Sequence, residues 1–77
     1  MKRLKYEKNA ILEVLNTYPG TNAEGIFQYI DKNMYLGVDR KDVMDAIGEL
    51  EKEGKIKYDV KVHGYYLIIN LDLDDII

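Results

Sequence analysis

The side chains that most often carry out chemistry in proteins are sparse in this sequence. His63 is the single histidine and the chain has no cysteine, so histidine dyads, thiolate nucleophiles and disulfides lack the residues they need. The run NLDLDD at residues 70–75 alternates oxygen-bearing residues, but it lacks the glycine and the distal glutamate of a calcium loop. We therefore predict no enzymatic activity, no metal site and no cofactor.

The residues best suited to binding a ligand are cationic, although the net charge of the chain is −3. Residues 39–53 carry six acids against three cations, whereas residues 55–63 carry three lysines and His63 against one aspartate. Lysines beside aromatic rings suit contacts with phosphate and with the minor groove of a nucleic acid. The candidate binding residues are Arg40, Lys41, Met44, Lys55, Lys57, Lys61, His63 and Tyr65.

Periodicity predicts the elements that would position these residues. Apolar residues at helical spacing predict helices over 5–17, 22–33 and 39–53. Alternating apolar and polar residues then predict a β-hairpin over 55–71, with HG at 63–64 as its turn. A basic arm over 1–4 and an acidic tail over 72–77 complete what we expect to be a single domain over 1–77.

Polar residues and a glycine mark the predicted helix ends. Thr21 and Glu24 have the spacing of a capping box for the second helix. Asp39 is the expected N-cap of the third helix, and Asp42 lies in its first turn, where the helix dipole favours negative charge. Gly54 is the expected C-cap glycine. Two of the aspartates near the third helix are therefore explained by helix formation alone.

Further expectations concern packing. Gly48 within the third helix indicates close approach of another helix or of a partner. In the hairpin, one face is expected to be buried (Ile56, Tyr58, Val60 and Val62) and the other to carry the cations (Lys55, Lys57, Lys61 and His63). Of the seven tyrosines, those expected in the core or an interface are Tyr6, Tyr18, Tyr29 and Tyr58, and those expected at the surface are Tyr35, Tyr65 and Tyr66. The tail residues expected to pack on the first helix or on a second subunit are Leu71, Leu73, Ile76 and Ile77.

Two stretches resemble known regulators over about residues 4–70. Residues 37–56, GVDRKDVMDAIGELEKEGKI, resemble the core of winged-helix regulators, and their pattern of residue types is similar to that of the gluconate-repressor-like (GntR) family. ILEVLNTYPGTNAEGIFQYI, at residues 11–30, resembles the first two helices of the MarR and ferric-uptake-regulator families. The resemblance implies an α+β winged helix-turn-helix, with three helices followed by a β-hairpin wing. Two positions depart from these families. Met44 stands where the gluconate-repressor-like family commonly carries arginine, and Asp45 stands where the ferric-uptake-regulator family commonly carries arginine.

The resemblance implies a small transcriptional regulator that binds double-stranded DNA as a homodimer. Its third helix would lie at the major groove through Arg40, Lys41 and Met44, and its wing would hold the backbone. The alternative is a protein–protein interaction module that presents an acidic third helix to a basic partner. The absence of cysteine and of an apolar run of about 20 residues leads us to expect a cytoplasmic protein without a membrane partner.

Overall fold

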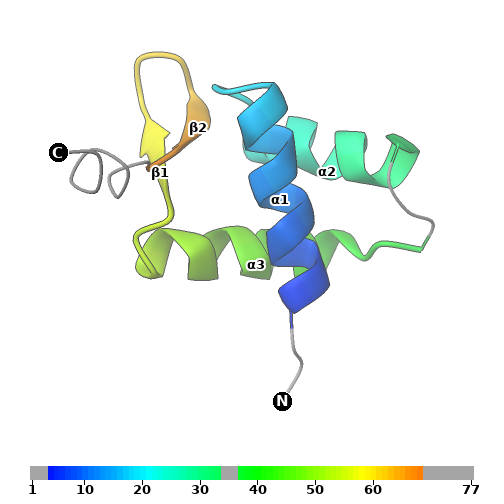
Figure 1. Ribbon diagram of the computed structural model, residues 1–77. Coiled ribbons are helices and arrows are strands. Elements are labelled where there is room, and N and C mark those ends of the chain that lie inside the picture. The colour runs from blue at the N-terminus through cyan, green and yellow to red at the C-terminus, as the bar shows by residue number, and fades with distance from the viewer. Residues whose placement is uncertain (1–3, 34–36, 69–77) are drawn as a thin grey trace, which may run out of the picture.

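The computed structural model describes residues 4–33 and 37–68. Their elements, shown in Figure 1, are α1 (Lys5–Thr17), α2 (Ala23–Asn33), α3 (Arg40–Lys52), β1 (Ile56–Asp59) and β2 (Gly64–Leu67). The helices begin and end within one residue of the predicted limits, and β1 pairs antiparallel with β2. The predicted fold class is confirmed: this is an α+β domain with the layout of a winged helix-turn-helix. None of the described helices is long and apolar enough to cross a membrane.

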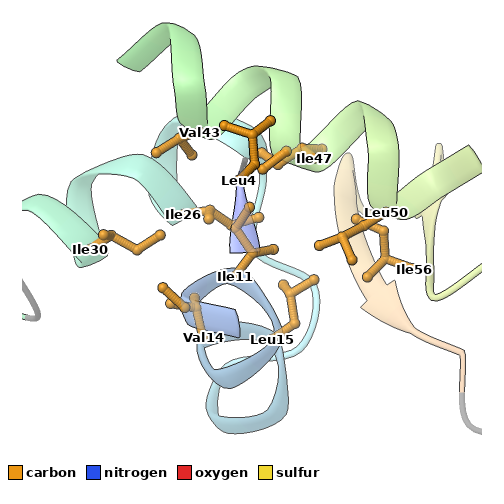
Figure 2. Packing of buried hydrophobic residues seen from close by; sticks show 12 residues of the cluster. Leu4, Ile11, Val14, Leu15, Ile26, Ile30, Val43, Ile47, Leu50 and Ile56 are labelled. Carbon is orange, nitrogen blue, oxygen red and sulfur yellow. The ribbon is translucent and has the colours of Figure 1, made fainter. Parts of the chain in front are cut away.

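The core lies where the apolar faces of the three helices meet β1, as Figure 2 shows. The helical faces arise because apolar residues recur every three or four positions along each helix. Leu4 belongs to this core with 7% of its surface exposed, so its assignment to a basic arm was wrong. The buried residues are Leu4, Ala10, Ile11, Val14, Leu15, Ile26, Ile30, Val43, Ala46, Ile47, Leu50 and Ile56.

The start of α2 differs from the predicted capping box. The Asn22 side-chain oxygen accepts a hydrogen bond from the Gly25 N–H at 2.7 Å, which is the contact of an N-cap residue. Thr21 instead donates its hydroxyl proton to the Tyr18 carbonyl at 2.6 Å. The capping-box prediction was therefore wrong, and Glu24 is available for another contact.

The two ends of α3 agree with prediction. The Asp39 carboxylate accepts from the Lys41 N–H at 3.0 Å, so Asp39 is the N-cap. At the other end, Gly54 has a φ of +76°. The Gly54 N–H donates to the Glu51 carbonyl and the Lys55 N–H to the Leu50 carbonyl, both at 3.0 Å, which is a Schellman motif. This turn directs the chain from α3 into β1.

The hairpin is shorter than predicted. β1 ends at Asp59, and residues 60–63 form a turn in place of the predicted HG turn. In this turn the Asp59 carboxylate accepts from the Lys61 N–H at 2.8 Å, and His63 has a φ of +56°. Val60 and Val62 are consequently 69% and 49% exposed, so the prediction that they alternate into the core was wrong.

A contact between the α1–α2 connection and β2 was not predicted. Thr21 forms an antiparallel bridge with Tyr65, in which the Gly20 N–H donates to the Tyr65 carbonyl at 2.8 Å and the Tyr65 N–H donates to the Thr21 carbonyl at 2.9 Å. The backbones of Gly20 and Gly64 approach so closely that a Cβ on Gly64 would lie 1.9 Å from the Gly20 carbonyl oxygen. This bridge attaches the hairpin to the helices.

Three of the four tyrosines expected in the core or an interface lie outside the core, and an interface role for them stays a prediction. Tyr6, Tyr18 and Tyr58 are 41%, 52% and 41% exposed, so they are not core residues. Tyr29 is half-buried, with its ring centroid 5.4 Å from that of Tyr18. Tyr65 and Tyr66 are half-buried, and surface contacts by them stay a prediction. The predictions for residues 1–3, for Tyr35 and for the tail residues beyond Ile68 lie outside the described residues.

Candidate nucleic-acid interface

The predicted binding residues form two separate groups on the structure. Arg40 and Lys41 begin α3, whereas the hairpin residues follow its other end, as Figure 1 shows. The 13 residues of α3 separate the two groups by roughly 20 Å at 1.5 Å per residue. An interface that used both groups would therefore extend along the whole of α3.

Arg40 is held by α2. Its guanidinium forms an ion pair with Glu24 in which Nη1 contacts Oε1 and Nη2 donates to Oε2 at 3.0 Å. The guanidinium carbon also lies 4.6 Å from the centre of the Phe27 ring, a cation–π arrangement. The hydrogen bond from Arg40, followed by one from Gln28, lowers the pKa of Glu24, and the same contact raises the pKa of Arg40. In this structure Arg40 therefore joins α2 to α3.

Lys41 is paired within its own helix. Its ammonium lies 3.4 Å from Oδ2 of Asp45, one helical turn away, and both side chains are more than half exposed. Such an exposed pair is weak, so a phosphate can compete for Lys41 at little cost. Asp45 nevertheless places a negative charge on the face of α3 that would meet a duplex, which disfavours close phosphate contact there.

A shallow depression of about 370 Å³ lies on the outward face of α3. Gly48 lines it, and a Cβ on Gly48 would meet no atom within 4 Å. The expected close packing of Gly48 against another helix was therefore wrong. Met44 is half-buried at the same place, where it also packs against the core. The residues lining the depression are Met44, Asp45, Gly48, Glu49 and Lys52.

The acids near the end of α3 are largely neutralised by lysines. Lys8 of α1 lies 2.8 Å from Glu49 and 2.7 Å from Glu53, while Lys55 lies 3.7 Å from Glu53. The hydrogen bonds that the Lys8 ammonium donates to Glu49 and Glu53 raise the pKa of Lys8, and the bond to Glu53 is the main cause that lowers the pKa of Glu53. The acidic character of α3 that the sequence indicates is thus reduced by contacts between elements.

The cations of the hairpin are more accessible. Lys57, Lys61 and His63 are all exposed, and within residues 4–33 and 37–68 neither lysine has an ion-pair partner. Lys57 belongs to β1, whereas Lys61 and His63 lie in the turn, so the prediction that they alternate on one strand face was wrong. The His63 Nδ1 lies 3.4 Å from the Tyr58 hydroxyl, which orients the imidazole.

Tyr65 has a structural position. It packs against the core, with its ring 5.1 Å from that of Tyr58, and its backbone makes the bridge to Thr21. Burial, with smaller contributions from Glu51 and Tyr58, raises the pKa of its hydroxyl. A contact between Tyr65 and DNA stays a prediction. Met44 and Lys55 likewise stay candidates.

Sequence reasoning missed the carboxylates that form ion pairs with Arg40 and Lys8. Glu24 meets Arg40 across 16 positions and Lys8 meets Glu53 across 45, so no local spacing reveals either pair. No group of three or more histidine, aspartate or glutamate residues that could hold a metal ion occurs in the described part of the chain.

Comparisons of the chain with protein-family models, with curated proteins and with solved structures found no match. The winged-helix assignment therefore depends on the order and pairing of the elements themselves. The described domain has three helices followed by an antiparallel hairpin, the topology of a winged helix-turn-helix.

Proposed function

We propose that this protein binds double-stranded DNA, with the hairpin on the phosphate backbone and α3 at the major groove. The observation that carries the proposal is the pair of exposed lysines, Lys57 and Lys61, which extend from the hairpin of a winged-helix layout and have no ion-pair partner among residues 4–33 and 37–68. Phosphate contacts supply most of the non-specific affinity of DNA-binding proteins. His63, in the turn with Lys61, adds a hydrogen-bond donor for the same backbone.

The proposal assigns α3 a smaller share of the affinity than the hairpin. Arg40 and Lys41 are engaged with carboxylates in the free protein, and Asp45 opposes phosphate nearby. A nearly neutral helix can still lie in the major groove when contacts on either side position it. We expect modest sequence preference and a strong dependence of affinity on salt. Regulation of transcription, a homodimer and a cytoplasmic location follow as further predictions of the same proposal.

Fluorescence anisotropy of a labelled random duplex, two helical turns long, tests this function. Wild-type protein should bind, and its affinity should fall steeply between about 50 and 200 mM salt. Lys57→Ala/Lys61→Ala should reduce the slope of log K against log salt by about 1.8, because each phosphate contact contributes about 0.9. Lys32→Ala is the matched control, because Lys32 is an exposed lysine at the end of α2, away from the hairpin. Equal binding by wild type and the double variant would refute the proposal.

A second candidate function is protein binding through the outward face of α3. The depression at Gly48, which Met44 also lines, offers space for a partner side chain. Because Asp45 and Glu49 line the depression, a basic partner would fit best. Gly48→Gln fills the depression without changing the charge. It should abolish binding of a basic partner, whereas the salt-dependent DNA affinity conferred by the hairpin should remain.

A further inference from the structure

The ion pair between Glu24 and Arg40 connects the first turn of α2 to the first residue of α3. Both terminal nitrogens of Arg40 contact the two carboxylate oxygens of Glu24. Arginine makes the same two-pronged contact with the oxygens of a phosphate group. A carboxylate and a DNA phosphate are therefore alternative partners for one guanidinium.

We propose that Glu24 competes with DNA for Arg40, holding the guanidinium in the free protein until a backbone phosphate displaces it. The inference rests on the proposed DNA binding and adds a residue that lowers its affinity. Glu24 is thus a positioning residue, which acts on DNA only through Arg40.

The surroundings of the pair allow the exchange. Arg40 and Glu24 are 54% and 47% exposed, so solvent and a phosphate can reach both, and pairs of this kind are weak. Gln28 donates a hydrogen bond to Oε2 of Glu24 at 3.1 Å, so the carboxylate keeps a partner when Arg40 leaves.

Phe27 directs Arg40 independently of Glu24. The ring lies 4.6 Å from the guanidinium carbon and supports one side of the planar group. When the carboxylate is replaced, this stacking keeps the guanidinium at the corner between α2 and α3 rather than releasing it into solvent. The edge of the group that now faces Glu24 is then available to a phosphate at the start of α3.

The test is a double-mutant cycle of Glu24→Gln and Arg40→Gln, measured by titration of a duplex at several salt concentrations. Glutamine keeps the shape of Glu24 but removes its charge, so Glu24→Gln should bind about two- to fivefold more tightly than wild type, the range expected for an exposed ion pair. The slope of log K against log salt should stay close to that of wild type, because Arg40 contacts a phosphate in both complexes once Glu24 is displaced. In the Arg40→Gln background, Glu24→Gln should change nothing.

Two results would overturn the inference. Glu24→Gln with wild-type affinity would mean that Glu24 does not compete for Arg40. A gain that persists in the Arg40→Gln background would mean that the lost negative charge acts on DNA directly. If wild type binds no duplex at any salt concentration, the proposed function and this inference both fail. If wild type binds and Glu24→Gln leaves the affinity unchanged, only the inference fails. Thermal unfolding of each variant verifies that it is folded.

Discussion

Alanine substitutions at Gly64 and Gly48 should change the stability of the fold in opposite directions. A Cβ on Gly64 would lie 1.9 Å from the oxygen and 2.4 Å from the carbon of the Gly20 carbonyl. These are backbone atoms, so the two segments must separate, and the two hydrogen bonds of the Thr21–Tyr65 bridge are lost. At about 1 kcal/mol for each bond, with strain added, Gly64→Ala should lower the free energy of unfolding by about 2–4 kcal/mol.

Gly48→Ala is the matched control. Its Cβ would meet no atom within 4 Å, and alanine is favoured over glycine in a helix by about 1 kcal/mol. In a domain of this size that gain should raise Tm by roughly 4–8 °C, while Gly64→Ala should lower Tm by at least about 8 °C. Urea and thermal denaturation followed by circular dichroism measure both changes. Wild-type stability of Gly64→Ala would refute the close approach of the hairpin to the α1–α2 connection.

The remaining stability predictions concern helix capping and acid. Asn22→Ala should destabilise the protein by about 1 kcal/mol in urea denaturation, whereas Thr21→Ser, which keeps the hydroxyl donor to Tyr18, should cost much less; equal losses would contradict the assignment of Asn22 as N-cap. The pKa values of Glu24 and Glu53 are lowered from their ordinary value of 4.5, so their stabilising contribution is present above pH 4.5 and is lost as the pH falls through the lower folded values. The fall in Tm between neutral pH and about pH 3 should therefore be smaller in Glu24→Gln/Glu53→Gln than in wild type, and an equal fall would contradict the pairing.

The helices could be predicted from sequence because their signals are local. The stripe Val43, Ala46, Ile47 and Leu50 and the flanking Asp39 and Gly54 occur within one short segment, and each has the predicted role in the structure. The hairpin turn was misplaced because it begins at Val60, in a stretch whose β-branched residues favour strands, rather than at His63. The alternation of apolar and polar residues in the sequence continues past the end of β1, so it predicted a longer strand, although Val60 and Val62 are exposed in the turn.

The candidate site was less predictable than the fold. The positions of Lys57 and Lys61 in the hairpin follow from sequence, but whether a described carboxylate pairs with them depends on which carboxylates the fold brings near them. Glu24 illustrates the difficulty, because its spacing from Thr21 suggested a cap while its partner is Arg40, on another helix. The bridge between Thr21 and Tyr65 is equally long-range, and the glycines that permit it, Gly20 and Gly64, give no periodic signal.

The most direct test of the central claim is to titrate the ¹⁵N-labelled protein with a random duplex and follow its backbone amide resonances. The account predicts the largest shifts at Lys57 and at residues 60–63, smaller shifts along the exposed face of α3, and loss of all of them at high salt. It also predicts little change in α1, which faces the core and the other helices. Unchanged hairpin resonances at saturating duplex, or shifts confined to α1, would contradict the account.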